Sequence, residues 1–346
     1  KKLTISGNNL NIKGSSVIAE NALINTKNVN IVSDVNYENR ESSSKTKTGF
    51  LSSKSSEEKS HEETNSTANL NVKNKAIIKG DVNLVGSNLV LGNDSFVGGK
   101  VTTDSRELHS SYSYKESKKG FSGSIGSGWF SVGYGKSESK LKEKDLTNAK
   151  SNLVLGDGTT LNKGADITAT NLIHGNISIN NGDVKFGARK DLKDVETSSK
   201  SSGINLSVKI KSDALDRAKQ GVDSFKQMKS GDILGGIASS TNTVTGIVSG
   251  LASNQGTKLP VSAAKADNTV GKDNLKAAQA TNNFYANAGV NLGFNKSSSE
   301  SKSHSESGVV TTIKGKNGNS SITYNDVKNI EYIGTQAQNT KFIYNN

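Results

Sequence analysis

Short apolar pairs that return every six or seven residues are the feature that most limits how this chain can fold. Near the start they are Leu3-Thr4-Ile5, Leu10-Asn11-Ile12, Val17-Ile18, Leu23-Ile24 and Val29-Asn30-Ile31. Polar residues such as Ser6-Gly7-Asn8-Asn9 separate the pairs, and these residue types favour tight turns. A helix would need apolar residues at i, i+3, i+4 and i+7, which this stretch lacks. The pattern therefore indicates very short strands joined by tight turns.

The same pattern returns in three later blocks, over residues 70–97, 153–186 and, more weakly, 322–344. Three such strands would close one coil of about twenty residues, and stacked coils would bury one continuous apolar column. Asn residues at the turns tolerate left-handed φ and can join their amides from coil to coil. We therefore predict an all-β fold, a parallel β-helix in which the repeated apolar residues form the core.

Composition supports repetition over compact packing. Only 32% of the residues are hydrophobic, so the chain is either disordered or buries a narrow stripe in each of many copies. Pro260 is the one proline, which is unusual for a disordered linker and suits long backbone hydrogen-bond ladders. The lack of cysteine excludes a disulfide framework and a thiolate metal site. Repeated coils are thus the favoured interpretation.

Three interruptions break the repeat, over residues 40–69, 109–148 and 196–308. Each has a Ser/Lys/Glu run, a centre of Gly and aromatic residues, and a second Ser/Lys/Glu run. Alternating small and charged residues suit a two-stranded ribbon, which we predict as a projecting β-hairpin arm; a low-complexity loop is the alternative. An isolated ribbon is marginal in water, so an arm needs a neighbour, a partner or a membrane. The β-helix coils are then 1–39, 70–108, 149–195 and 309–346.

The third interruption contains an insert at about 212–283. Residues 213–229 predict a helix with an apolar stripe of Leu215, Ala218, Val222 and Phe225. The following segment, 233–253, has no charge, and Gly246 and Gly250 have the spacing of close helix packing in membranes. It is about long enough to span a bilayer, yet Ser, Thr and Asn dilute it. Two alternatives stand: conditional membrane insertion, or a soluble helical hairpin packed on the β-helix.

The net charge of +12 admits two interpretations. One is attraction to an anionic partner such as lipopolysaccharide, acidic glycans or acidic lipids. The other is positive charge spread over a solvated surface, which the alternation of Lys with Glu favours. We expect no nucleic-acid partner.

No motif in the sequence indicates catalysis. His61-Glu62-Glu63 does not continue into a zinc-binding H-E-x-x-H motif, and Gly135-Lys136-Ser137 lacks the earlier glycine of a phosphate-binding loop, where Phe130 stands. The strand positions carry Asn, Ser and Thr rather than the clustered carboxylates of polysaccharide-cleaving β-helix enzymes. We predict that the chain is not an enzyme and has no catalytic residue, metal or cofactor.

Two arm motifs carry a family resemblance: S-S-S-K-x-x-x-G-F from Ser42 and N-K-S-S-S-E from Asn295. Combined with the interrupted repeat, they resemble the haemagglutinin repeats of filamentous-haemagglutinin-type exoproteins. These include the CdiA effectors of contact-dependent growth inhibition, and the likeness is to their second, more distal repeat region. The resemblance implies a right-handed parallel β-helix and a secreted protein at the bacterial cell surface. It also implies an outer-membrane two-partner secretion transporter, acting on a region outside this chain, and a possible toxin module downstream.

The leading functional hypothesis is contact-dependent toxin delivery to, or across, a target-cell outer membrane. The alternative is an adhesin or structural filament segment that binds host or neighbouring-cell glycans. A carbohydrate-active enzyme is a third and disfavoured class. The candidate membrane or partner contacts are Phe50, Tyr112, Tyr114, Phe121, Trp129, Phe130, Tyr134, Ile233, Leu234, Ile237, Gly246, Ile247, Val248, Gly250 and Leu251.

Overall fold

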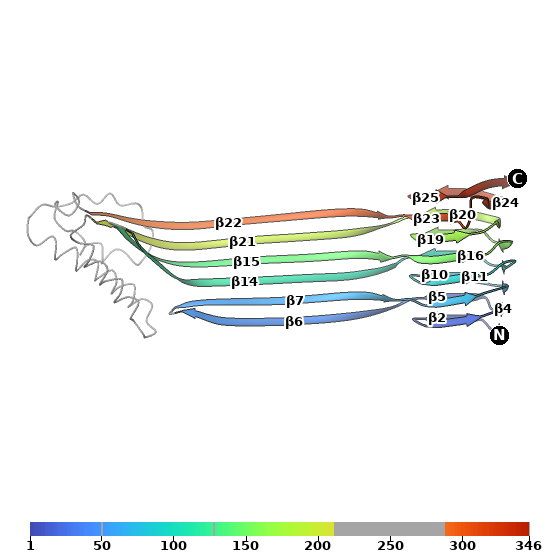
Figure 1. Cartoon of the computed structure of the whole chain (residues 1–346), viewed down its shortest axis with the longest axis horizontal. Coiled ribbons are helices and arrows are strands. Elements are labelled where there is room, and N and C mark those ends of the chain that lie inside the picture. Colours follow the sequence, from blue (N-terminus) through green and yellow to red (C-terminus); the bar gives the residue numbers. More distant parts are fainter. Residues whose placement is uncertain (50, 127–128, 211–287, 346) are drawn as a thin grey trace, which may run out of the picture.

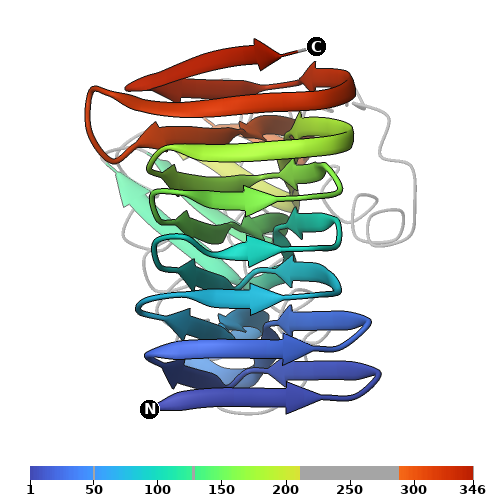
Figure 2. The same ribbon diagram turned by 90° about the vertical axis from the view of Figure 1, so that its right-hand side faces the viewer.

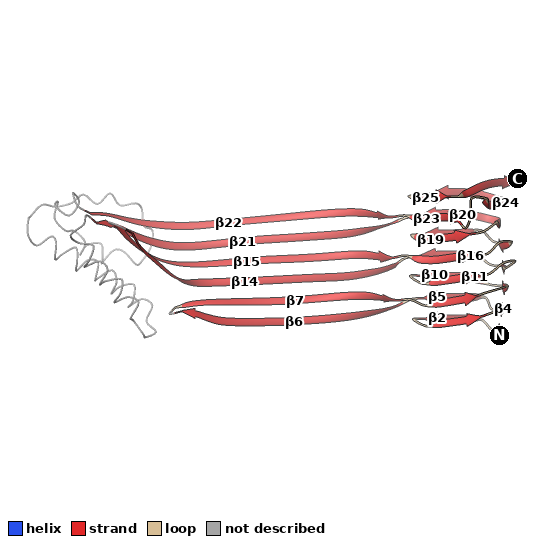
Figure 3. Cartoon of the chain, viewed as in Figure 1, coloured by secondary structure: helices blue, strands red, loops and turns tan. Residues whose placement is uncertain are grey.

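The computed structural model describes residues 1–49, 51–126, 129–210 and 288–345. All secondary-structure elements among these residues are β-strands, which confirms the predicted all-β class (Figure 3). The strands divide between a stacked column and a long sheet that projects from one side of it (Figure 1). The predicted helix at 213–229 and the uncharged segment 233–253 lie outside the described residues.

The column is a parallel β-helix with three strand-lined faces. The first face contains β1 (Lys2–Ser6), β4 (Asn21–Asn25), β9 (Ala76–Ile78), β12 (Phe96–Val97), β17 (Thr159–Leu161) and β26 (Thr340–Asn345). The second contains β2 (Asn9–Lys13), β5 (Asn28–Val32), β10 (Asp81–Val85), β13 (Val101–Asp104) and β18 (Ala165–Thr168). The third contains β3 (Ser16–Ala19), β8 (Asn69–Val72), β11 (Asn88–Leu91), β16 (Ser151–Leu155), β19 (Thr170–His174), β23 (Thr311–Gly315) and β25 (Thr335–Gln338). Two longer strands, β20 (Ile177–Gly187) and β24 (Ser320–Tyr332), serve the first two faces in turn.

Consecutive coils pair in parallel and in register, as Figure 2 shows. Asn9 pairs with Asn28, a step of 19 residues, close to the predicted repeat of about twenty. Outward-facing asparagines join the coils through their side chains, although those named here belong to strands and not, as predicted, to the turns. On the third face, the Asn88 amide nitrogen donates to Asn69 Oδ1 over 2.6 Å, and Asn152 donates to Asn88 Oδ1 over 2.7 Å.

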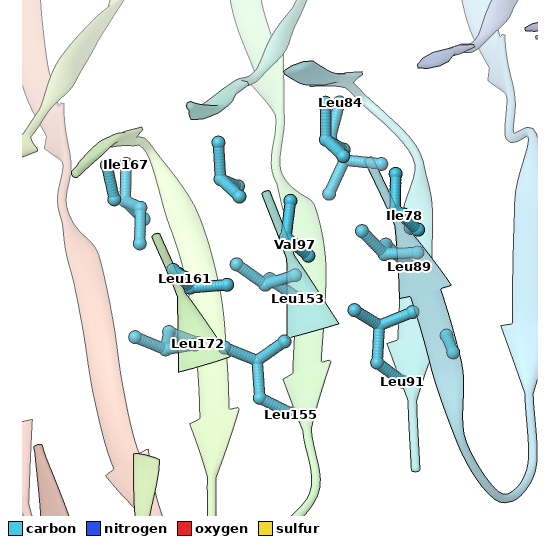
Figure 4. Packing of buried hydrophobic residues seen from close by; sticks show 14 of the residues in the cluster. Ile78, Leu84, Leu89, Leu91, Val97, Leu153, Leu155, Leu161, Ile167 and Leu172 are labelled. Carbon is cyan, nitrogen blue, oxygen red and sulfur yellow. The ribbon is translucent and has the colours of Figure 1, made fainter. Parts of the chain in front are cut away.

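Alternation along each strand fills the inside of the column. In β16, Leu153 and Leu155 point inward and are buried, whereas Val154 between them points outward. Leu153 pairs in register with Leu89 on one neighbouring coil and Leu172 on the other, so leucines stack along the column (Figure 4). Most apolar residues of the predicted repeat form this core, but Ile18 (66% exposed) and Ile173 (37% exposed) face outward, because adjacent residues of a strand point to opposite sides. The prediction was wrong for these two, and also for Phe96, Tyr332 and Tyr344, which are exposed. The stabilisation of the core comes from many small burials, each worth about 25 cal/mol per Å² of apolar surface removed from water.

The three arms are β-hairpins that leave the column at one corner, after a strand of the second face and before a strand of the third. They are β6 (Asp34–Gly49) with β7 (Ser52–Ser66), β14 (Arg106–Gly126) with β15 (Trp129–Ala149), and β21 (Arg189–Ile210) with β22 (Ala288–Val309). One coil without an arm separates each arm-bearing coil from the next, β9–β11 in the first case and β17–β19 in the second. The low-complexity loop considered as an alternative is therefore wrong for the described residues.

The arms also pair with each other, which the sequence did not predict. They form one six-stranded antiparallel sheet, the arm sheet, in the order β22-β21-β15-β14-β7-β6 (Figure 1). Coils rise by about 4.8 Å, so two coils rise by about the width of one hairpin. Arms on alternate coils are thus spaced correctly for edge-to-edge hydrogen bonding. The sequence indicated that a lone ribbon needs a neighbour, a partner or a membrane to become ordered. In the structure each arm has another arm as its neighbour.

Candidate contact surface of the arm sheet

The far end of the arm sheet is built from four strands, because the first arm is shorter than the other two. Strand β7 pairs with β14 only from Ser110 to Lys119 of β14. Beyond Lys119, the strands β14, β15, β21 and β22 continue together away from the column (Figure 1). This four-stranded end contains adjacent rows of aromatic and aliphatic residues.

The strand register places four large side chains, three aromatic and one aliphatic, in one row across these strands. Phe121 pairs with Tyr134, Tyr134 with Ile204, and Ile204 with Phe294. Directly paired residues share a face of the sheet, so the four side chains are neighbours. The Phe121 and Tyr134 ring centroids lie 4.9 Å apart, within the range of favourable ring pairs.

A second apolar row lies two residues further from the column. Val132 pairs with Leu206, and Leu206 pairs with Leu292. Because side chains alternate with period two, this row shares its face with the first. We call the seven residues of both rows the tip face: Phe121, Val132, Tyr134, Ile204, Leu206, Leu292 and Phe294. Ile204 is 45% exposed and Phe294 55% exposed, so the tip face is open to solvent.

The other face of the same four strands is small and polar. Its rows alternate with those of the tip face and contain Gly120, Ser122, Ser124, Ser131, Gly133, Gly135, Gly203, Asn205, Ser207, Asn291, Gly293 and Asn295. No large apolar side chain is among them, although Trp129, 38% exposed, lies at the outermost pair on this side. The end of the sheet is therefore amphipathic from face to face.

Lysines border the tip face on the side toward the column. Lys119 pairs with Lys136, and both share the row of Ser202 and Lys296. We call Lys119, Lys136 and Lys296 the lysine row. Within the described part of the chain none of the three forms an ion pair, whereas Lys140, further toward the column, lies 2.9 Å from Glu138. The lysine row therefore presents positive charge next to the aromatic row.

Closer to the column the arms are joined by ion pairs. Glu116 of β14 contacts Lys118 at 2.5 Å and reaches Lys54 of the first arm at 2.8 Å. Hydrogen bonds from these two ammonium groups lower the pKa of Glu116 to about 2. Two carboxylates of β15 similarly face Lys193 of the third arm at 3.8 Å. These pairs help to hold the hairpins side by side.

The sequence-predicted contact residues fall into three groups. Phe121 and Tyr134 meet on the tip face, as neighbours in one row. Tyr112 and Tyr114 lie on the opposite face, nearer the column, since their positions in β14 differ in parity from that of Phe121. Tyr114 donates a hydrogen bond to Glu116 over 3.1 Å, and this bond raises the pKa of Tyr114.

Other predicted contacts are not tested by the structure. Phe130 belongs to β15, but its side chain is not among those described. Trp129 is exposed but stands apart from the tip face. Outside the described residues lie Phe50, Ile233, Leu234, Ile237, Gly246, Ile247, Val248, Gly250 and Leu251.

Five residues of the tip face were missed as contacts: Val132, Ile204, Leu206, Leu292 and Phe294. For the last four, the signal is the strict alternation in Gly203-Ile204-Asn205-Leu206-Ser207 and Asn291-Leu292-Gly293-Phe294-Asn295. Such alternation marks a strand with one apolar face.

Other classes of site find little support in the described residues. No three His, Asp or Glu side chains gather there in a metal-binding arrangement. Nor does that part of the chain contain a helix long and apolar enough to cross a membrane.

Comparison with known proteins gives one family match. Residues 48–168 match the family model described as hemagglutinin repeat, from the end of β6, halfway through the first arm, through the second arm to β18. No curated protein and no solved structure matches the chain. Residues 48–168 thus carry a filamentous-haemagglutinin-type repeat, and repeats of this kind suggest a segment of a large, adhesin-like protein that is secreted or at the cell surface.

Proposed function

We propose that this segment acts in contact-dependent toxin delivery to, or across, the outer membrane of a target cell. The observation that supports the proposal is the amphipathic end of the arm sheet. A strand of 22 residues extends roughly 70 Å at about 3.3 Å per residue, so the tip face stands far from the column. A surface held there is placed to meet another cell.

The proposal assigns the two regions different tasks. The column is a rigid support, because its coils share one buried core. The arm sheet is the contacting element. In this proposal an outer-membrane transporter exports the protein through a region outside residues 1–346, and a toxin module follows downstream.

A binding assay on cells tests the proposal. Labelled chain is incubated with Gram-negative target cells and with outer-membrane vesicles from them, beside a variant in which residues 120–135 are replaced by Asn-Gly. We expect the shortened arm to lower bound protein at least tenfold while the far-ultraviolet circular dichroism of the column persists. Unchanged binding by the shortened variant would refute the assigned contact.

Delivery itself needs the parent exoprotein on donor cells. The same replacement there should abolish growth inhibition of target cells without lowering the amount of exoprotein on the donor surface. Full inhibition at normal display would rule out a delivery role for this end of the sheet.

An adhesin that binds glycans is the second candidate, and one observation favours it. Tyr37, at the base of the first arm, is 71% exposed and stacks on His61 with 6.3 Å between ring centroids. An open ring of this kind suits a sugar face. If periodate treatment of the target cells removed binding, and Tyr37→Ala did the same, the adhesin function would replace delivery.

A further inference from the structure

We infer that the tip face is a lipid-docking surface that enters the interface of a bilayer with anionic, phosphate-bearing headgroups at a tilt, so that the far end of the sheet is the deepest. The inference rests on the proposed function for the identity of the target, and it adds the chemistry and orientation of the contact. It is carried by the order of residue types along the sheet rather than by hydrophobicity alone.

Along the strands, the residue types follow the depth profile of a membrane interface. Among the described side chains of this face, the aliphatic row of Val132, Leu206 and Leu292 lies furthest from the column, and next comes the row that contains Phe121, Tyr134 and Phe294. The lysine row follows, about 7 Å nearer the column, because two residues along a strand span that length. Aromatic rings prefer the headgroup level, and lysine side chains reach from there to phosphate.

Charge complementarity selects an anionic partner. Among the described residues no direct ion pair holds the three ammonium groups of the lysine row, although, beside the hydrogen bond from Lys140, Lys136 is near enough to Glu138 to help lower the pKa of that carboxyl. The lysine row can therefore meet phosphate oxygens. Basic groups near an anionic surface add attraction that salt screens within about 10 Å. The tip face supplies apolar contact, and the lysine row supplies the preference for negative headgroups.

The opposite face fixes the mode of binding. Its Gly, Ser and Asn residues and the free edge of β22 would leave polar groups unsatisfied in hydrocarbon. In addition, the amphipathic stretch of each strand beyond the lysine row covers only about seven residues. A strand that spans a bilayer needs roughly nine to eleven residues. The sheet therefore enters the interface at a tilt with one face inserted and does not cross the bilayer.

Protein-free vesicles test the inference with the full chain. Sedimentation with vesicles of phosphatidylcholine alone is compared with sedimentation with vesicles that contain 30% phosphatidylglycerol. We expect at least tenfold tighter binding to the anionic vesicles at 50 mM salt, and loss of most of this preference at 500 mM salt. Equal binding to both compositions would contradict the role of the lysine row.

Three variants separate the contributions. Ile204→Ser with Phe294→Ser should weaken binding to both vesicle types at least tenfold. Lys119→Gln, Lys136→Gln and Lys296→Gln together should remove only the anionic preference. The matched control is Asn205→Ser with Asn295→Ser, in the same two strands on the opposite face, and it should bind as the parent does. Each variant keeps residues 211–287 unchanged.

A depth probe gives a readout that does not depend on affinity. Trp129→Phe with Phe294→Trp places the single tryptophan on the tip face, and brominated lipids should quench its emission and vesicles should shift it to the blue. Trp129→Phe with Asn295→Trp should respond weakly. Equal quenching of both would overturn the one-faced orientation.

Two outcomes would assign the tip face elsewhere. If the chain dimerised in solution without lipid, and Ile204→Ser with Phe294→Ser abolished the dimer, a second copy would cover the face. If the chain bound target cells but not vesicles, the lipid inference would be wrong. The proposed function would then require a protein or glycan receptor. Conversely, if the tip-face variants lost vesicle binding but still delivered toxin normally, the lipid inference would stand and the proposed function would fall.

Discussion

The column and the arm sheet are both built from β-strands, but different interactions stabilise them. Column strands are two to six residues long except where β20 and β24 turn a corner, and they are parallel around a dry apolar core. Arm strands are 15 to 22 residues long and antiparallel, with solvent on both sides and a largely polar surface. Short strands suffice where stacking buries their side chains. Where little is buried, length and neighbouring hairpins replace the core.

The largest difference should appear when the same apolar group is removed from each region. Leu153→Ala in the column leaves a cavity between Leu89 and Leu172 and should lower the free energy of unfolding by about 3 kcal/mol. Leu141→Ala in the arm sheet should cost about 1 kcal/mol or less, because that side chain is only partly buried. Urea unfolding followed by circular dichroism measures both. Equal losses would break the comparison.

Glycine substitutions should separate the regions next. At Gly92 an added Cβ would lie 2.0 Å from the carbonyl oxygen of Asn74, a backbone atom of the previous coil. Gly92→Ala should therefore destabilise the column by about 1–3 kcal/mol, the usual range for overpacking. At Gly123 in the arm sheet the nearest atom is 3.7 Å away, so Gly123→Ala should be nearly neutral. Thermal melts of the two variants provide the test.

A fall in pH should change the stability of the two regions in opposite directions. Burial lowers the pKa of His174, whose Nδ1 donates to the Gly175 carbonyl oxygen in the column. The unfolded chain gains a proton near the ordinary value of 6.5 before the folded chain does, so the column loses stability as the pH falls below that value. Asp194 raises the pKa of His304 in the arm sheet, so that contribution is complete below pH 6.5 and is lost as the pH rises through the raised pKa.

Two variants isolate these opposite contributions. His174→Gln should reduce the acid-induced loss of melting temperature between pH 7.5 and pH 5.5. His304→Gln should reduce hydrogen-exchange protection of β21 and β22 at pH 5.5 more than at pH 8.5. The same sign in both regions would contradict the assignment of one histidine to burial and the other to a carboxylate.

Salt should have the smallest effect and should act on the arm sheet alone. Glu116 and Lys54 lie at the solvent-facing surface of the sheet, and such pairs contribute little and are screened. Glu116→Gln, or 1 M salt, should lower exchange protection where β7 meets β14 by about two- to fivefold. Protection of β16 should not change. A large effect in β16 would mean that the arms support the column, contrary to the comparison above.

The sequence predicts the column well because its signal is local. The inward positions of β2, β5 and β16 are apolar pairs spaced by one residue, and the turns between the strands have the expected polar residues. In adjacent pairs such as Val17-Ile18 only one residue faces inward. The arms could be predicted as hairpins because their signal is also local. Their union into one sheet could not, because β7 pairs with β14 only if the column spaces the arms correctly.

The candidate site was predicted in part for a related reason. Aromatic residues in the arm centres were easy to recognise, yet the side each one faces depends on strand parity. Parity separates Phe121 from Tyr112 in one strand and unites Phe121 with Phe294, far away in the sequence, through two intervening strands. Listing aromatics alone therefore mixed two faces and overlooked the aliphatic residues that complete one of them.

The match between coil rise and hairpin width constrains how such a chain can lengthen or shorten. Removal of one armless coil would bring two hairpins about 5 Å too close for their strands to remain side by side. Loss or gain of two coils with one hairpin would leave every remaining pair in step. We therefore expect duplications and deletions that preserve the projecting surface to come in that compound unit, each of which adds or removes one hairpin of the arm sheet.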